Sequence, residues 1–169
     1  MEITIRTLTP DDAEELLRLS LRLDQETAYM LYEPGERKTT VEQQRSRLTA
    51  IHESEHSTFI GAFDQEQLVG FIAGNGSSLK RVRHSLYIVI GILQQYSGQG
   101  IGKKLFRELE AWARAHGIHR MELTVMAHNE PAVKLYTAMG FEIEGTKKHS
   151  LILNGAYIDE YYMAKILEN

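Results

Sequence analysis

The feature that most constrains the fold is a glycine-rich stretch between two different hydrophobic patterns. Residues 85–93 are rich in Ile and Val and predict a strand. Gly98, Gly100 and Gly102 follow at alternate positions, and an amphipathic pattern then predicts a helix that begins near Gly100. Glycine allows a ligand to approach the backbone closely, and the N-terminus of a helix attracts anions. With Lys103 in the first turn, the stretch predicts a site for a phosphate-bearing ligand.

The spacing of the glycines excludes two common nucleotide-binding motifs. A dinucleotide fingerprint requires G-x-G-x-x-G, whereas this stretch has G-x-G-x-G-K, and the P-loop pattern G-x-x-x-x-G-K-[ST] is not matched. A glycine-rich turn before a helix is also common without any ligand. The glycine-rich stretch alone does not distinguish a binding site from a turn without a ligand, so motifs elsewhere in the chain are needed.

Composition narrows the class of protein. The 169 residues predict one domain, residues 1–169, with a single core. The chain has no cysteine, which excludes disulfides, and its His residues show no metal-ligand spacing, so no metal is expected. We find neither a signal peptide nor a membrane span and expect a cytoplasmic protein. A net charge of -4 gives no general attraction to nucleic acid, and the basic residues 80–84 indicate a solvated loop.

The first third of the chain predicts one strand and two helices. Residues 3–8 alternate as in a strand, and Thr9 caps a helix that runs to about Leu23. The aromatic-rich residues 29–32 precede a turn, and they either floor a pocket or close the core. Thr39–Glu42 resembles the capping box of a second, largely exposed helix.

The central third predicts strands. Residues 57–63 and 67–74 indicate an antiparallel hairpin. The strand at 85–93 is expected to be buried on both faces because of its apolar composition. Gly91 within it suggests either a bulge or the close approach of a ligand.

The last third predicts alternating helices and strands. The helix after the glycine turn ends at Gly117, residues 121–125 predict a strand, and Asn129 caps a further helix that ends at Gly140. Asn154-Gly155 predicts a tight turn between two final strands. This order of elements indicates a mixed sheet with helices on its faces, of the α/β or α+β class.

Two motifs resemble those of the GCN5-related N-acetyltransferases, the GNAT family. Gln95–Gly100 fits the acyl-CoA pyrophosphate pattern [QR]-x-x-G-x-[GA], and the overlapping frame 97–102 carries Ser where the family has Arg or Gln. The resemblance covers about residues 85–165 and implies a mostly antiparallel sheet of six to seven strands with about four helices. The second motif of the family is matched by Leu123–Val125, Asn129, Pro131-Ala132, Leu135-Tyr136, Gly140-Phe141 and Glu144-Gly145.

The resemblance implies transfer of an acetyl group from acetyl-CoA to a primary amine of a small molecule. Residues 144–163 look most like the subgroup that acetylates free amino acids, and acetyltransferases of polyamines share this ending. Acetylation of a polyamine or a protein N-terminus, or non-catalytic sensing of acyl-CoA, are the alternatives. A homodimer is also expected, whereas a nucleic-acid or membrane partner is not.

The resemblance also implies which residues form the site. The strand edge around Ile92 would bind the pantetheine and the thioester carbonyl, and the loop 98–103 would bind the pyrophosphate. Tyr136 would protonate the departing thiolate, although a core tyrosine is the alternative, and Asn129 would contact the cofactor or simply cap its helix. The full cofactor set is Ile92, Leu93, Gln94, Gln95, Gly98, Gln99, Gly100, Ile101, Gly102, Lys103, Asn129 and Tyr136.

The general base is the least defined residue. The resemblance implies that the family's glutamate before the second helix corresponds to Thr124, so Glu122, two residues earlier on the same face of its strand, is the candidate. A solvated carboxylate is the alternative for Glu122. His84 and His128 are further candidates, or ordinary loop histidines.

Residues 25–38 and 147–160 are expected to select the acceptor because they lie outside the shared cofactor core. A free amino acid would require a cation such as Arg37 or Lys38 for its carboxylate. A polyamine would instead require acids, for which the candidates are Glu33, Glu36, Asp159 and Glu160.

Overall fold

A computed structural model describes residues 2–168, which form one seven-stranded sheet in the order β1-β2-β3-β4-β5-β7-β6. Neighbouring strands are antiparallel except for β4 and β5, which are parallel, so the predicted mixed and mostly antiparallel sheet is confirmed. The strands are β1 (Ile3–Thr7), β2 (Thr58–Asp64), β3 (Gln67–Asn75), β4 (Ser85–Ile92), β5 (Arg120–Met126), β6 (Glu142–Leu153) and β7 (Ala156–Ile166). The helices are α1 (Ala13–Glu26), α2 (Val41–Glu53), α3 (Ile101–Ala115) and α4 (Glu130–Ala138), with short 3-10 turns η1 (Pro10–Asp12) and η2 (Gln94–Tyr96).

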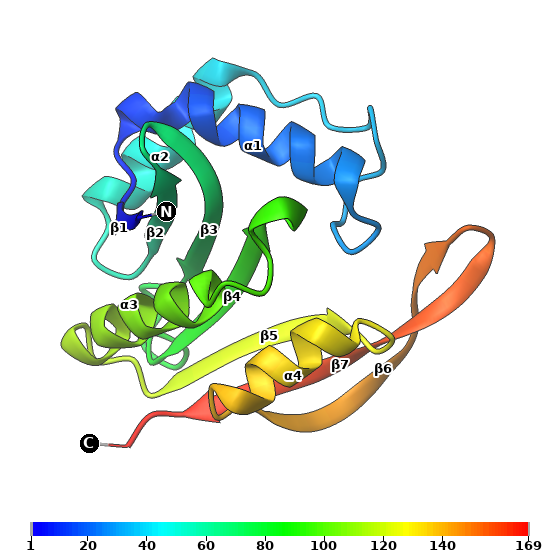
Figure 1. Cartoon of the computed structure of the whole chain (residues 1–169). Coiled ribbons are helices and arrows are strands. Elements are labelled where there is room, and N and C mark those ends of the chain that lie inside the picture. Colours follow the sequence, from blue (N-terminus) through cyan, green and yellow to red (C-terminus); the bar gives the residue numbers. More distant parts are fainter. Residues whose placement is uncertain (1, 169) are drawn as a thin grey trace.

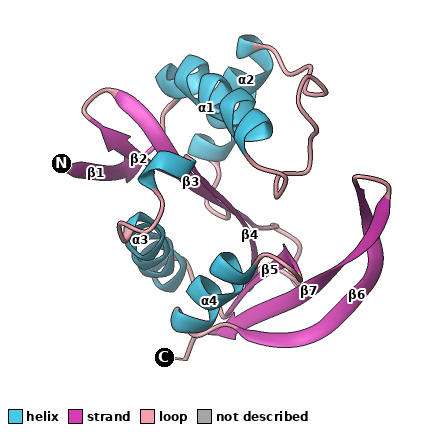
Figure 2. Cartoon of the chain, turned by 45° about the vertical axis from the view of Figure 1, so that its right-hand side comes forward, coloured by secondary structure: helices cyan, strands magenta, loops and turns pink. Residues whose placement is uncertain are grey.

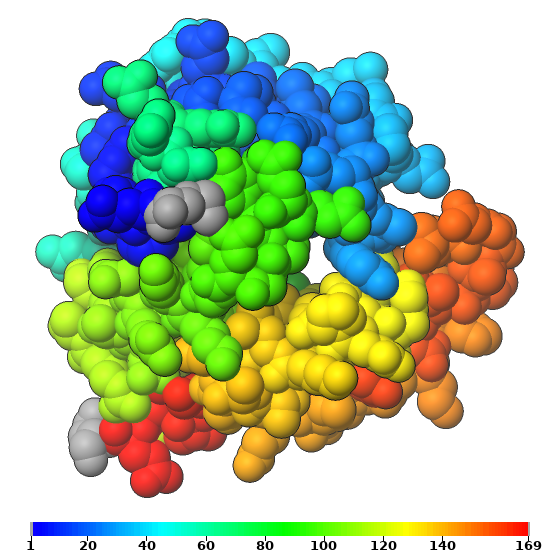
Figure 3. All heavy atoms as spheres, viewed as in Figure 1, coloured from blue at the N-terminus to red at the C-terminus, as the bar shows by residue number. Residues whose placement is uncertain are grey.

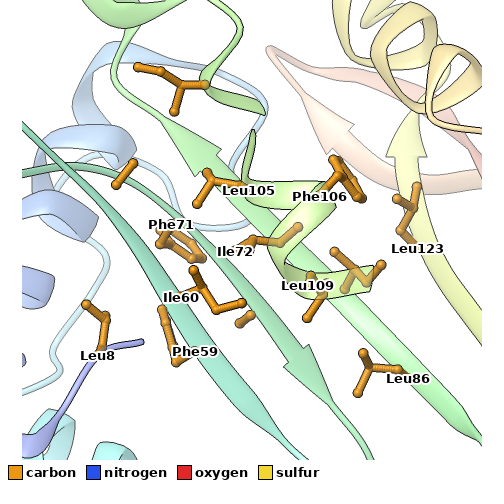
Figure 4. Packing of buried hydrophobic residues seen from close by; sticks show 14 of the residues in the cluster. Leu8, Phe59, Ile60, Phe71, Ile72, Leu86, Leu105, Phe106, Leu109 and Leu123 are labelled. Carbon is orange, nitrogen blue, oxygen red and sulfur yellow. The ribbon is translucent and has the colours of Figure 1, made fainter. Parts of the chain in front are cut away.

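Helices cover both faces of the sheet. Figures 1 and 2 show α1 and α2 on one face and α3 and α4 on the other. A methyl group on Gly91 of β4 would lie 2.9 Å from Leu23 of α1, so the odd-numbered residues of β4 face α1. A methyl group on Gly74 of β3 would instead lie 3.0 Å from Leu109 of α3, on the other face. The apolar stripe of α3 packs into the sheet beside Ile60, Ile72 and Leu86 (Figure 4). The core therefore has two layers, one on each face.

The two central parallel strands diverge soon after they begin. β4 and β5 pair only at Ser85–Arg120, Leu86–Met121 and Tyr87–Glu122, and beyond these pairs each strand continues without the other. The divergence is visible in Figure 1, where β4 and β5 run apart toward η2 and the tip of α4. Backbone groups at the inner edges of these strands lose their sheet partners beyond Tyr87. This produces an opening between β4 and β5 in the centre of the sheet.

Turn residues explain where several elements end. Asn154 and Gly155 both have positive φ angles, 51° and 80°, as the predicted tight turn between β6 and β7 requires. Gly117 and Gly140 have φ angles of 74° and 95° and follow α3 and α4. These predictions are confirmed because each depends on local backbone conformation.

Two local predictions were wrong. The capping box of α2 uses Thr40 and Gln43, one residue later than predicted, because the hydroxyl of Thr40 accepts the N–H of Gln43 at 3.1 Å. The central strand β4 is not buried on both faces, since Tyr87 and Val89 are 39% and 38% exposed. Their side chains lie on the α1 side of the sheet, beyond the area that α1 and α2 cover.

Gly91 does not form a bulge. The β3–β4 pairing runs without interruption from Gly70–Ile92 to Asn75–Tyr87. A side chain at Gly91 would instead collide with Leu23 and Phe71. The glycine therefore allows α1 to pack closely on β4, and the backbone groups at the opening are released by the divergence of β5 rather than by a bulge.

An ion pair near the N-terminus predicts loss of stability in acid. Asp12 accepts two hydrogen bonds from Arg6 at 2.9 Å and one from the N–H of Thr9 at 2.7 Å, and the bonds from Arg6 contribute most to lowering the Asp12 pKa in the folded protein. Stabilisation by a carboxylate with a lowered pKa is present above its unfolded pKa of about 4 and is lost as the pH falls through the folded value.

Urea unfolding between pH 3 and 6 should therefore show a smaller pH dependence for Asp12→Asn than for the wild type. Asp11→Asn, a change in the adjacent exposed acid, is the control and should keep the wild-type slope. Equal slopes for Asp12→Asn and the wild type would contradict this assignment.

Candidate active site

The loop between β4 and α3 forms an anion cradle. Gly98 and Gly100 have φ angles of 74° and 81°, and a methyl group on either would have no heavy atom within 4 Å, so both face open space. Gly100 is the N-cap of α3, whose first N–H groups have no acceptor within the helix. The hydroxyl of Tyr96 donates a 2.7 Å hydrogen bond to the carboxylate of Asp64, which fixes the loop to the end of β2. The cradle fits a phosphate group on geometry alone.

Two residues of the predicted cofactor set have a structural reason to be in the loop. A methyl group on Gly102 would lie 2.8 Å from the side chain of Leu135, so Gly102 lets α3 and α4 pack closely. The side chain of Ile101 is buried in the core. Both residues can offer only backbone N–H groups to a ligand, whereas Lys103 and Gln99 have exposed side chains.

The edge of β4 presents free backbone groups to the opening. The N–H of Leu93 donates to Val69 of β3 at 2.9 Å, which assigns this residue to the hydrogen-bonded set of the β3–β4 ladder. Because such pairs alternate, the N–H groups of Ile92 and Ile90 point away from β3, toward the space that β5 has left. The backbone N–H groups of Ile92 and Ile90 are thus free to donate to a ligand in the opening. The N–H of Leu93 is already bonded within the sheet.

Hydrogen bonds join the residues after β4 to the C-terminal end of α1. The carboxylate of Glu26 accepts the backbone N–H of Gln94 at 2.8 Å and also pairs with Arg22 at 3.3 Å. Arg22 in turn donates to the side chain of Gln95 at 3.4 Å. The N–H of Gln94, predicted to contact a cofactor, is therefore occupied by a carboxylate of the chain itself.

Tyr136 lies on α4 beside the opening. Its ring packs edge-on against Phe106, with ring centroids 5.6 Å apart, and only 8% of the residue is exposed. Burial raises the pKa of the Tyr136 hydroxyl, with a smaller contribution from Tyr87. Within residues 2–168 the Tyr136 hydroxyl has no hydrogen-bond partner. Every fully buried side-chain polar atom in these residues does have a partner, so the Tyr136 hydroxyl must be accessible to solvent. Figure 3 shows a hollow in the surface between the green segment around η2 and the yellow helix α4.

A hydrogen bond spans the point where β4 and β5 separate. The hydroxyls of Tyr87 on β4 and Thr124 on β5 are 2.8 Å apart. Tyr87 is the last residue of β4 that pairs with β5, and its side chain lies on the α1 face of the sheet. Thr124, expected from the family resemblance at the position of the glutamate, thus pairs with a phenol and not with a charged group.

The candidate bases differ in their surroundings. Glu122 is bonded to Arg120 at 2.6 Å, and Arg120 also binds Glu144, so the carboxylate is part of an ion-pair network. Glu122 is thus an ion-paired carboxylate, 38% exposed, close to the solvated alternative, and its catalytic role stays a prediction. His84 precedes β4 at the paired end of the β4–β5 ladder, away from the opening, whereas His128 packs against Tyr29 with ring centroids 5.4 Å apart.

Asn129 occupies the N-cap of α4. Its side-chain oxygen accepts the N–H of Ala132 at 3.4 Å. The capping role that the sequence suggested is confirmed, and contact with a cofactor stays a prediction.

A pocket of about 340 Å³ lies between the α1–α2 loop and the tip of the β6–β7 hairpin. Met30, Leu31 and Tyr32 line it, which favours the pocket interpretation of the aromatic-rich segment. The two segments expected to select the acceptor are thus brought together. Its lining residues include Asp24, Glu26 and Glu33 but no Lys, Arg or His.

Arg37 lies beside this pocket without offering a free charge to it. Its guanidinium binds the buried carboxylate of Asp24 at 2.7 and 3.0 Å and stacks on Tyr32. A guanidinium engaged in this way leaves little capacity for a carboxylate of a ligand. The lining is therefore acidic in composition, with Asp24 and Glu26 each paired with an arginine.

Comparison with known proteins identifies the family. Residues 19–141 match the family described as Acetyltransferase (GNAT) family, which is more than half of the chain. The protein belongs to the GNAT family. This assignment confirms the predicted family.

Individual relatives differ in how much of the GNAT protein they cover. The L-amino acid N-acetyltransferase AaaT of Escherichia coli K12 is 36% identical over 103 residues, which are 59% of this chain and 62% of AaaT, less than two thirds of its length. The spermidine N(1)-acetyltransferase of Thermoplasma acidophilum is 26% identical over 93% of this chain and 99% of its own. A crystal structure of a GNAT-family acetyltransferase from Streptococcus pneumoniae has 32% identity and a TM-score of 0.95, with 98% and 100% of the two chains covered.

Two further observations concern the described part of the GNAT protein. No helix among residues 2–168 is long and apolar enough to cross a membrane. Within the same residues, no three His, Asp or Glu side chains are grouped as metal ligands.

Sequence reasoning missed the Glu26–Gln94 bond, the Tyr87–Thr124 pair and the Asp24–Arg37 ion pair. One signal was available for Asp24, which continues the buried stripe of α1 through Leu16, Ser20 and Leu23. An acid on an apolar stripe requires a partner.

Proposed function

We propose that the protein transfers an acetyl group from acetyl-CoA to the primary amine of a small molecule, with a free amino acid as the first candidate acceptor. The observation that carries the proposal is the divergence of β4 and β5 next to an anion cradle and a buried phenol. The printed activity of AaaT supports an amino acid as acceptor. We also propose that the enzyme acts in the cytoplasm and forms a homodimer, as the family resemblance implies.

The cradle would hold the diphosphate of acetyl-CoA. Gly98, Gly100 and the first N–H groups of α3 offer donors, and Lys103 adds a positive charge. Bound acetyl-CoA supplies the activated acetyl group as a thioester. Ile92 and Ile90 would donate their N–H groups to a carbonyl oxygen held in the opening, which stabilises negative charge as it develops there.

Tyr136 would serve as the general acid. The new C–N bond forms as the C–S bond breaks, and the sulfur must then gain a proton. Burial raises the pKa of Tyr136, so at neutral pH the phenol is in the protonated form that a general acid requires. After it protonates the thiolate, the proton that the acylated nitrogen loses restores the phenol through solvent. The amine must lose a proton before it attacks, and we keep Glu122 as the candidate base, acting through water.

A polyamine is the second candidate acceptor. The acidic lining of the pocket favours a cationic ligand, and Arg37 is engaged by Asp24. The printed activity of the Thermoplasma relative supports this candidate. Acetylation of a protein N-terminus would require room for a longer chain at the same pocket.

An amine panel tests the proposal. Purified protein is incubated with acetyl-CoA and with L-amino acids, spermidine or a short peptide, and release of free thiol is compared with the mass of the amine product. We expect an acetylated small amine, with the highest kcat/KM for an amino acid or for spermidine. Preference for spermidine over every amino acid would replace the first candidate by the second. Binding of acetyl-CoA without turnover on any amine would indicate a sensor and overturn the proposed function.

A further inference from the structure

Glu26 lies between the two parts of the proposed active site. It is the last residue of α1, one turn beyond Leu23, which packs at Gly91 of β4. One oxygen of its carboxylate accepts the N–H of Gln94, directly after β4, and the residue also lines the acceptor pocket. The same carboxylate therefore contacts the donor side and faces the acceptor side.

The bond to Gln94 places an anion on a backbone N–H close in the chain to the proposed donor site. Gln94 follows Ile92, whose N–H points into the opening between β4 and β5. A backbone N–H held by a carboxylate can serve a bound molecule only if the carboxylate leaves. The negative charge of Glu26, partly offset by Arg22 at 3.3 Å, also opposes a negatively charged donor.

The other acids of the pocket are less able to bind a cation. Asp24 is fully engaged by Arg37 through two hydrogen bonds. Glu33 is exposed and lies in a loop turn in which its own N–H donates to Glu36. One oxygen of Glu26 is held by Gln94 and would be free once the N–H is released, while the other oxygen stays paired with Arg22 at 3.3 Å.

We propose that Glu26 couples the donor site to the acceptor site, an inference that rests on the proposed function. Without a donor, Glu26 holds the N–H of Gln94. A donor oxygen displaces it, and the released carboxylate then binds the ammonium group of the acceptor in the pocket. Each ligand therefore strengthens the binding of the other, because such coupling is reciprocal.

The direction of the change in CoA affinity on replacing Glu26 distinguishes this role from a purely structural hydrogen bond. If Glu26 competes with the donor, Glu26→Ala should bind CoA about three- to tenfold more tightly than the wild type in isothermal titration calorimetry. Glu26→Gln keeps an oxygen for the Gln94 N–H but loses the charge, and it should lie between the two. Glu14→Gln, a charge removal at an exposed residue of α1 outside the pocket, should match the wild type in CoA affinity.

Acceptor binding gives a second readout. The probe is the better acceptor found in the amine panel, either spermidine or the most active L-amino acid, titrated with and without saturating CoA. In the wild type we expect CoA to tighten acceptor binding at least about fivefold, and in Glu26→Gln we expect a factor near one. The comparison of the wild type with Glu26→Gln still tests the proposal if Glu26→Ala shows no cooperative melting transition.

Three outcomes would overturn the inference alone: weaker CoA binding by a folded Glu26→Ala, equal coupling in the wild type and Glu26→Gln, or no coupling in a wild type that acetylates amines. A wild type that does not bind CoA would overturn the proposed function as well. The two failures are therefore distinguishable.

Discussion

Tyr136→Phe is expected to lower kcat by at least about tenfold with little change in acetyl-CoA affinity or melting temperature. The substitution keeps the ring and its edge-on contact with Phe106, and the hydroxyl has no hydrogen-bond partner in residues 2–168 that the fold would lose. A thiol has a pKa near 8.5, so a departing thiolate gains from a proton delivered in the transition state, an effect typically worth about a hundredfold to ten-thousandfold. Loss of kcat without loss of binding indicates an interaction made mainly in the transition state.

The control for this variant is Tyr161→Phe, which removes another partly buried phenol hydroxyl without a bonded partner among the described residues and should retain turnover. The pH profile adds a second check. Because burial raises the pKa of Tyr136, loss of its proton should reduce kcat only above about pH 10. Unchanged turnover in Tyr136→Phe would assign Tyr136 to the core and leave the thiolate to be protonated by solvent or by the amine.

Gly100→Asp is expected to weaken acetyl-CoA binding by roughly a hundredfold, since it places a negative charge at the start of α3 in the anion cradle. The matched control is Gly100→Asn, which has the same shape without the charge. Asn and Asp both tolerate the left-handed conformation that the φ angle of 81° requires better than other residues. Calorimetry should show a much smaller loss for Asn than for Asp, with similar melting temperatures. Equal affinity of the two variants would show that the diphosphate does not bind at Gly100.

Local features of the fold could be predicted from the sequence because neighbouring residues determine them. The Asn154-Gly155 turn, the glycine stops of α3 and α4, and the glycine-rich turn before α3 each depend on positive φ angles. The capping box of α2 was placed one residue early because two threonines are adjacent, and each has a Glu or Gln three residues later. Only the geometry of the helix start decides between the two frames.

Features that depend on contacts across the sequence could not be predicted. The role of Gly102 requires Leu135 on another helix, and that of Gly91 requires Leu23 and Phe71. Glu26 and Gln94 are 68 residues apart, and nothing in either segment indicates their bond. The opening between β4 and β5 was expected only from the family resemblance, since a strand that loses its partner has the same apolar pattern as one that keeps it.

The central claim is that the donor thioester lies in the opening between β4 and β5, within reach of Tyr136. The most direct test is a crystal structure of the protein with bound CoA. We expect the diphosphate against residues 98–103 and the thiol sulfur between β4 and β5, within about 3.5 Å of the Tyr136 hydroxyl. A sulfur atom outside this opening, or a diphosphate away from the cradle, would contradict the account.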